Sequence, residues 1–245
     1  MIRGLLFDYG GTIDTNGLHW AVLLKQAYNK FELLISDDLF YDAYCYGERS
    51  LAINPLVKPF HNFYDTLLLK VREQFKYLKD RGLILDSEYI ESISLYCYQY
   101  AKRTIQTNKP ILEELSNKYP MVMVSNFYGN LKSVLEDFRI NQMFQVIVES
   151  AVVGIRKPDP MIYRLGAEKL HLTPDHCMVI GDSFSKDIVP AKNIGCHTIW
   201  LRRESWIDAL DVQHPDTMRL SDIQLNDFSK ISGELSQFNS RFKKG

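Results

Sequence analysis

An aspartate near the N-terminus stands where a chain can present an acid for chemistry. Asp8 follows the apolar run at residues 5–7 and precedes Gly10, Gly11 and Thr12. A buried strand that ends on a carboxylate before a flexible turn offers that carboxylate as a nucleophile or a metal ligand. Backbone amides in the turn can approach a bound anion closely, because glycine has no side chain. The segment therefore indicates a site that handles phosphoryl groups.

Three later segments carry side chains that suit the same chemistry. They offer a hydroxyl, an ammonium group and two carboxylates, at Ser125, Lys157, Asp182 and Asp187. Ser125 can donate to a phosphate, and Lys157 can place a compact positive charge against both the phosphate and Asp8. Asp182 is a hard oxygen ligand of the kind that Mg²⁺ prefers. Asp187 could merely cap the helix that follows it.

The elements that must position these residues alternate short apolar strands with helices. The expected strands are residues 2–8, 121–126, 146–153, 177–182 and 197–201, and helices are expected at 132–138 and 160–170. This alternation is typical of a parallel sheet with crossover helices. Ligands in such sheets bind at the carboxyl ends of the strands. Asp8, Ser125 and Asp182 each stand at such an end.

The segment from residue 15 to residue 104 has no strand pattern and is expected to form several helices. In one of them, apolar residues recur at three- and four-residue spacing: Phe60, Phe63, Tyr64, Leu67, Leu68, Val71, Phe75 and Leu78. Another covers residues 88–104 and is rich in tyrosine. Such stripes are typical of the packing core of a helical bundle. We therefore predict an α/β core domain of residues 1–14 and 105–245, with a helical cap domain of residues 15–104 inserted into it.

Composition argues against several other classes of protein. The formal net charge of −1 over 245 residues gives no electrostatic reason to bind nucleic acid or a membrane surface. No apolar run approaches the ~20 residues that span a bilayer, and the first strand begins too early to leave room for a signal peptide. Four cysteines have no paired spacing: Cys45, Cys97, Cys177 and Cys196. We therefore expect four buried, reduced thiols in a cytoplasmic protein.

Four separated segments together resemble the haloacid dehalogenase-like (HAD) hydrolase superfamily. They are residues 8–12, 121–126, 154–160 and 179–187, the last leading into 191–195. The resemblance covers the core, whereas the cap matches only in type. It is to the helical-cap branch, which contains phosphatases and phosphoglucomutases. The fold it implies is a Rossmann-like core of three layers, with the parallel sheet in the middle and the helical cap above.

The resemblance also implies a role for each candidate residue. Catalysis would rest on Asp8, as the nucleophile that forms an aspartyl-phosphate, with Ser125 and Lys157. The implied substrate-binding residues are Tyr9, Gly10, Ser125, Asn126 and Lys157. The implied cofactor is Mg²⁺, held by Asp8, the carbonyl of Gly10 and Asp182, with Asp187 as a further ligand or an anchor behind them. The substrate would be a small phosphorylated metabolite, and the oligomeric state is left open.

Gly10 departs from the family pattern. Phosphatases and mutases of the family usually carry a second aspartate two residues after the nucleophile, and it protonates the leaving oxygen and then activates water. Removing a positioned general acid or base typically costs about 10²- to 10⁴-fold in rate. Hydrolysis of simple monoesters should therefore be slow unless another group substitutes. Asp14 and His19 are the nearby titratable candidates, and His19 fits a hinge or packing role equally well.

Three functions stay open on this basis. The first is a weak Mg²⁺-dependent phosphatase, or one whose substrates have good leaving groups, such as acyl phosphates. The second is a phosphonatase-like C–P hydrolase, a branch in which a small residue replaces the second aspartate and a cap lysine forms a Schiff base. The available lysines are Lys25, Lys58, Lys70, Lys76 and Lys79. The third is a protein that binds a phosphate or metabolite without turnover.

The phosphatase is the leading interpretation. A relic would have no need of the complete set Asp8, Ser125, Lys157, Asp182 and Asp187. A haloacid dehalogenase proper displaces halide without a metal, and an aspartate in the Gly-Asp-Ser setting of Asp182 argues against that reaction.

Overall fold

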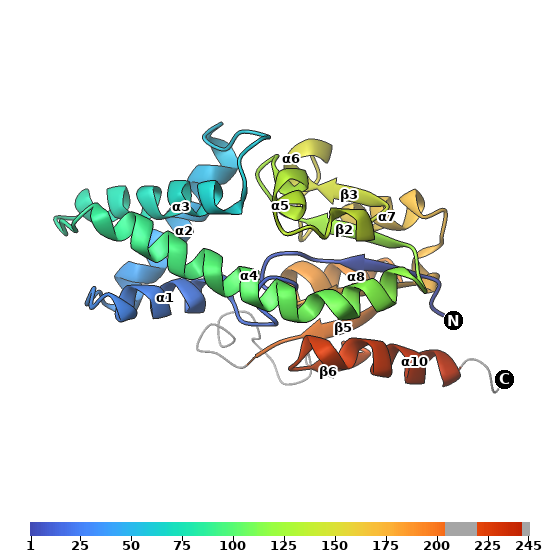
Figure 1. Ribbon diagram of the computed structural model, residues 1–245. Helices are drawn as coiled ribbons and strands as arrows, with labels where there is room; N and C mark the ends of the chain where they lie inside the picture. Colours follow the sequence, from blue (N-terminus) through green and yellow to red (C-terminus); the bar gives the residue numbers. More distant parts are fainter. Residues whose placement is uncertain (204–219, 242–245) are drawn as a thin grey trace.

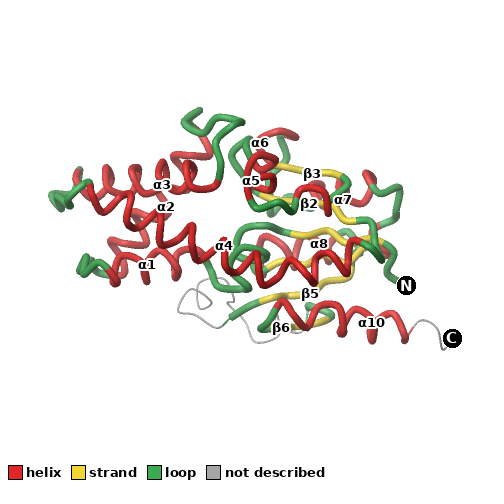
Figure 2. Tube along the Cα trace, in the orientation of Figure 1, coloured by secondary structure: helices red, strands yellow, loops and turns green. Residues whose placement is uncertain are grey.

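The computed structural model describes residues 1–203 and 220–241. Its strands form one sheet in which every neighbouring pair runs parallel, in the order β3-β2-β1-β4-β5-β6 (Figures 1 and 2). The strands are β1 Gly4–Phe7, β2 Met121–Ser125, β3 Val146–Glu149, β4 Cys177–Gly181, β5 His197–Leu201 and β6 Ile223–Leu225. The parallel sheet confirms the predicted α/β class.

Helices cover both faces of this sheet. One face packs against α4 (Glu88–Ser116), α5 (Leu131–Asp137) and α10 (Ile231–Arg241), and the other against α7 (Met161–Lys169) and α8 (Val189–Asn193). Leu5 and Phe7 of β1 belong to the first cluster and Leu6 to the second, because successive side chains of a strand point to opposite faces. Both layers are therefore apolar, and the strands between them are nearly continuous hydrophobic runs.

The cap is built from helices that follow β1. They are α1 Trp20–Lys30, α2 Asp37–Ile53, α3 Phe63–Lys79 and the first part of α4. Helix α3 begins at a capping box, in which Asn62 and Asp65 each accept the other's backbone amide hydrogen bond. Its apolar stripe is buried at Phe63, Leu67 and Val71, which confirms the predicted packing role of most of the stripe.

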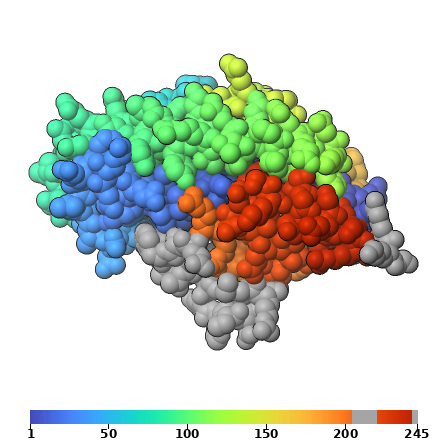
Figure 3. Space-filling model, turned by 60° about the horizontal axis from the view of Figure 1, so that its bottom comes forward, coloured from blue at the N-terminus to red at the C-terminus, as the bar shows by residue number. Residues whose placement is uncertain are grey.

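Helix α4 joins the cap to the core (Figure 1). It is 29 residues long and continues past residue 104 without a break. Its C-terminal part buries Leu112 and Leu115 in the core. Helix α10 lies along this part (Figure 3). The Ser232 hydroxyl donates to the Glu114 carboxylate at 2.5 Å. The predicted boundary between residues 104 and 105 falls inside α4, so the division into core and cap domains stays a proposal.

Short elements complete the described fold. Helix α6 covers Ser150–Val153, 3₁₀ turns cover Asn141–Met143, Pro174–His176 and Phe228–Lys230, and a π-helical turn covers Phe184–Ile188. The proposed core domain also includes residues 204–219 and 242–245, which lie outside the described residues. No helix in the described part of the chain is long and apolar enough to cross a membrane.

The structure corrects the sequence predictions at several points. The third strand ends at Glu149, and residues 150–153, predicted as strand, form α6, in which Val152 is exposed. Phe60, assigned to the helical stripe, precedes α3 and is exposed. Strand β6 was not predicted, because three residues carry too little periodicity. All four thiols are free and three are buried, but Cys45 is exposed.

Candidate active site

The carboxyl ends of three strands meet at one edge of the sheet. Phe7 lies opposite both Met123 of β2 and Ile180 of β4. The amide of Asp8 donates to the carbonyl of Ile180 at 2.9 Å, which fixes the residue just past the strand. Asp8, Ser125 and Asp182 therefore stand at the edge where a parallel sheet binds its ligands.

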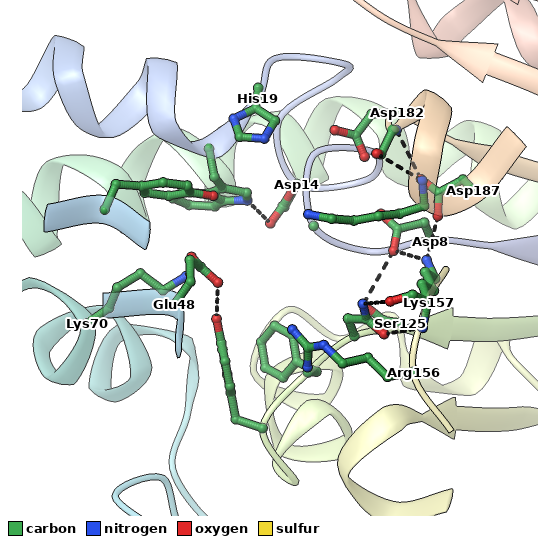
Figure 4. A pocket seen from close by; sticks show the side chains of 18 of the residues that line it. Asp8, Asp14, His19, Glu48, Lys70, Ser125, Arg156, Lys157, Asp182 and Asp187 are labelled. Atoms are coloured by element: carbon green, nitrogen blue, oxygen red, sulfur yellow. Dashed lines mark hydrogen bonds and ion pairs between the residues drawn. The ribbon is translucent and has the colours of Figure 1, made fainter. Parts of the chain in front are cut away.

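A cavity of about 130 Å³ lies between this edge and the cap (Figure 4). One side, which we call the core wall, carries the predicted site residues Asp8, Gly10, Ser125, Asn126, Lys157, Asp182 and Asp187. The opposite side, the cap wall, carries His19, Trp20, Tyr44, Glu48, Phe63 and Lys70. The structure thus brings together most of the residues that the sequence singles out, from segments that lie far apart in the chain.

Lys157 is the centre of the core wall. Its Nζ lies 2.6 Å from Asp8 Oδ1 and 2.7 Å from Asp187 Oδ1, and all three side chains are buried. Burial disfavours the charged ammonium, but the two carboxylates outweigh it and raise the pKa of Lys157. Asn126 holds the lysine backbone, since its Oδ1 accepts from the Lys157 amide at 2.9 Å and its Nδ2 donates to the Lys157 carbonyl at 3.1 Å.

Asp8 itself receives donors on both carboxylate oxygens. Ser125 Oγ lies 3.4 Å from Asp8 Oδ1, and Thr12 Oγ1 lies 3.1 Å from Asp8 Oδ2. Burial raises the pKa of Asp8, and the neighbouring Asp187 adds to that effect while Lys157 opposes it. The nucleophile candidate is thus oriented by three donors.

Three carboxylates of the core wall lie close enough to share a cation. Asp8, Asp182 and Asp187 each offer an oxygen within 4.8 Å of the others. Burial raises the pKa of Asp182 well above its usual value, and the charges of Asp8 and Asp187 raise it further. One lysine does not balance three acids, and hard oxygen donors in this number suit Mg²⁺. The residues present therefore fit a divalent cation.

Gly11 is required beside this cluster. Its φ of +95° is a left-handed conformation, and a Cβ there would lie 2.1 Å from Asp182 Oδ2. The glycine lets the turn after Asp8 approach the Asp182 carboxylate.

Asp187 is already engaged by donors. Its Oδ1 accepts from Lys157 and, at 2.6 Å, from the Tyr163 hydroxyl, and its Oδ2 accepts from the Ser183 amide at 3.0 Å. Of the roles predicted for it, this arrangement suits an anchor for Lys157 better than a direct metal ligand.

Tyr9 differs from the other predicted residues. Its side chain does not line the cavity and is fully buried, with edge-to-face contacts to Phe63 and Phe127 at 5.8 and 5.7 Å between ring centroids. Only its backbone could serve a phosphate.

The cap wall contains an ion pair that the sequence analysis did not single out. Lys70 Nζ lies 2.6 Å from Glu48 Oε1, and the Tyr128 hydroxyl donates to Glu48 Oε2 at 2.5 Å. Burial lowers the pKa of Lys70, but Glu48 outweighs it and the net shift is upward. A signal was present in the sequence, because Lys70 follows Phe63 and Leu67 on the buried stripe of α3. A lysine on an apolar helix face must be paired or face a cavity.

The turn after the nucleophile contains the two substitutes considered for the missing acid. Asp14 accepts from the Gly11 amide at 2.7 Å through Oδ1 and from Trp20 Nε1 at 2.9 Å through Oδ2. Its burial raises its pKa to about 7. His19 caps α1, and its Nδ1 accepts from the amide of Ala21 at 3.1 Å.

Comparison with known proteins identifies the family of this chain. The sequence model of the haloacid dehalogenase-like hydrolases matches residues 2–195. A glyceraldehyde 3-phosphate phosphatase from Pyrococcus furiosus is 28% identical over 86 residues, which cover 35% of this chain and 33% of that protein. The chain spans less than half the length of the curated relatives it matches.

Solved structures share the fold across nearly the whole chain. The HAD hydrolase YfnB from Bacillus subtilis, solved with magnesium bound, has a TM-score of 0.57 and 16% identity over 96% of this chain and 98% of that one. A dehalogenase with an intermediate complex has a TM-score of 0.62 and 17% identity, over 94% and 95% of the two chains. At these identities the likeness concerns the fold alone. The match of the family model over most of the chain shows that the protein belongs to the haloacid dehalogenase-like hydrolases.

Proposed function

We propose that the protein is a Mg²⁺-dependent phosphatase that acts on a small phosphorylated metabolite through an aspartyl-phosphate on Asp8. The observation that carries this proposal is the buried contact of Asp8 with Lys157 and Ser125, with the Asp182 carboxylate beside it. A phosphatase among the relatives supports the same reaction class.

The core wall supplies what phosphoryl transfer needs. Asp8 would attack phosphorus while Lys157 and Ser125 hold the phosphate oxygens and offset their charge. Asp8, Asp182 and the carbonyl of Gly10 would hold Mg²⁺, which when bound would neutralise charge on the phosphate. The cap wall would close the site and exclude water from it.

The geometry favours this reaction over a phosphonatase-like one. Lys70 is the one lysine, of the five considered, that lines the cavity. A Schiff-base lysine must be neutral to attack a carbonyl, whereas the Glu48 carboxylate keeps Lys70 protonated. The ion pair therefore suits recognition of a substrate better than covalent chemistry.

Phosphate release from a panel of phosphorylated metabolites, acetyl phosphate and p-nitrophenyl phosphate tests the proposal. We expect turnover that requires Mg²⁺, stops with EDTA and is lost in Asp8→Asn. Asp38→Asn, the same change at an exposed position on the cap, should leave turnover unchanged. Absence of phosphate release from every substrate, with Mg²⁺ present and the protein folded, would overturn it.

A further inference from the structure

The proposed reaction needs a proton donor and a proton acceptor that Gly10 cannot supply. A leaving alkoxide must be protonated as its bond to phosphorus breaks, and water must lose a proton as it attacks the aspartyl-phosphate. We propose that Asp14 is the general acid and base of this site, acting from the turn after Gly10. The inference rests on the proposed phosphatase function and names the residue that completes it.

Asp14 lies beside the space that Gly10 leaves open. Trp20 contacts both positions. Its Nε1 lies 2.9 Å from Asp14 Oδ2 and 3.8 Å from the place that a Cβ on Gly10 would occupy. An aspartate side chain at residue 10 would extend toward the same indole. Asp14 lines the same cavity as Asp8, between the cap residues and the Asp8–Lys157 pair (Figure 4).

The carboxyl group of Asp14 is held in one orientation. Each oxygen accepts one hydrogen bond, Oδ1 from the Gly11 amide and Oδ2 from Trp20, and each keeps a second lone pair that can carry a proton. Gly11 belongs to the same turn as the nucleophile, so the acid and the nucleophile are tied to one short segment. Preorganisation of this kind is what a general acid requires.

The surroundings make both protonation states of Asp14 available near neutral pH. Burial raises its pKa, the two hydrogen bonds lower it, and the charges of Asp8 and Lys70 act in opposite directions. The other charged or titratable side chains that line the cavity are His19, Tyr44, Glu48, Tyr128, Arg156, Lys157, Asp182, Lys186 and Asp187. His19 is the less suitable candidate, because its Nδ1 is committed to the N-terminus of α1.

The proton movements balance over the cycle. An Asp8 oxygen forms a bond to phosphorus, the bond to the leaving oxygen breaks, and that oxygen takes the proton of Asp14. Water then attacks the aspartyl-phosphate and gives a proton to the Asp14 carboxylate, while the bond between phosphorus and Asp8 breaks. The products are the alcohol and phosphate, and both aspartates return to their starting states.

A purely structural role for Asp14 predicts different kinetics. The bond to Trp20 also holds α1 against the nucleophile turn, so Asp14→Asn could lower activity by disturbing the cap. Loss of an acid, however, affects substrates according to their leaving groups. Poor alkoxide leaving groups need the proton, whereas the acetate of acetyl phosphate leaves without it.

The test measures kcat/KM of wild type and Asp14→Asn with an alkyl phosphate from the panel and with acetyl phosphate. We expect a fall of about 10²- to 10⁴-fold with the alkyl phosphate and of less than about tenfold with acetyl phosphate. Adding Gly10→Asp to Asp14→Asn should restore alkyl phosphate hydrolysis. Equal losses on both substrates, without rescue by Gly10→Asp, would assign Asp14 a structural role and overturn the proposal.

A second variant applies if Asp14→Asn does not fold. Trp20→Phe removes the indole donor that lowers the pKa of Asp14, so the alkaline limb of the kcat/KM profile should move to higher pH. An unmoved limb would contradict the proposal. If wild type itself releases no phosphate, both proposals fail, whereas turnover that needs Asp8 but is insensitive to Asp14→Asn overturns only this one.

Discussion

The core wall and the cap wall of the cavity hold their charges in different ways. On the core wall, Lys157 is shared between Asp8 and Asp187, and Asp182 adds a third carboxylate to the cluster. On the cap wall, Lys70 and Glu48 neutralise each other at 2.6 Å. We infer that the core wall is built for a cation and phosphoryl chemistry, and the cap wall for recognising a polar substrate group.

The largest effect is expected when the core wall loses Lys157, whose ammonium group Asp8 and Asp187 share. Lys157→Met leaves Asp8 and Asp187 without their common partner in a buried place. We expect phosphate release to fall by about 10³-fold or more for every substrate, and the free energy of unfolding to fall by about 3 kcal/mol. Phosphate assays and urea denaturation measure the two effects. Lys169→Met, at an exposed position, is the control, and a similar loss in that variant would contradict the account.

Substitutions of two neighbouring glycines in the nucleophile turn test whether the core wall holds the metal. In Gly11→Ala the new Cβ would meet the Asp182 carboxylate, so we expect Mg²⁺ affinity to fall by about tenfold or more and stability by about 1–3 kcal/mol. Gly10→Ala meets only ordinary contacts with Trp20 and should change stability by no more than about 0.5 kcal/mol. Calorimetric titration with Mg²⁺ and thermal unfolding compare the two variants. Equal behaviour of the pair would argue against a metal held at Asp182.

The cap wall should affect substrates selectively. Lys70→Met removes the partner of Glu48 while leaving the core wall intact. We expect KM to rise by about tenfold for a polar phosphorylated metabolite, while kcat/KM for acetyl phosphate stays within about threefold. An equal loss of kcat/KM on both substrates would mean that the cap wall does not act in substrate recognition alone.

The last expected effect concerns the pH dependence of stability. The folded state holds the pKa of Asp14 at about 7, against an ordinary value of 3.8. Its contribution to stability is therefore present at low pH and is lost as pH rises through that window. Between about pH 4 and 7, the free energy of unfolding without metal should decline less steeply in Asp14→Asn than in wild type. Parallel curves for the two proteins would contradict the raised pKa.

Most of the core wall was predictable from sequence because most of its residues end a strand or begin the next turn. Asp8, Ser125 and Asp182 follow buried apolar runs, and parallel strands bring their carboxyl ends to one edge. Lys157 depends on a longer-range feature, since it reaches Asp8 through a loop held by Asn126. Its assignment came from the resemblance to a family.

The cap wall was less predictable because helix periodicity identifies a buried face and does not identify its partner. The stripe of α3 predicted packing correctly at Leu67 and Val71, yet the cavity lies against the same stripe at Phe63 and Lys70. Which side chain of another helix meets Lys70 depends on how α2 and α3 pack. Glu48 was therefore missed.

The wrong strand prediction for residues 150–153 also arose because hydrophobic periodicity describes only neighbouring residues. Val152 and Val153 extended an apolar run that suggested strand, but the chain turns at Glu149, whose carboxylate accepts from the amides of Gly129 and Leu131. That turn depends on a partner some twenty residues away, which periodicity cannot show.

The central claim is that Asp8 carries the phosphoryl group during turnover. The direct measurement is rapid acid quenching of the protein mixed with Mg²⁺ and acetyl phosphate labelled in its phosphoryl group, followed by peptide mapping. The account predicts label on the peptide that contains Asp8 in wild type, and none on that peptide in Asp8→Asn. Turnover by wild type without label on that peptide, or label that persists on it in Asp8→Asn, would contradict the claim.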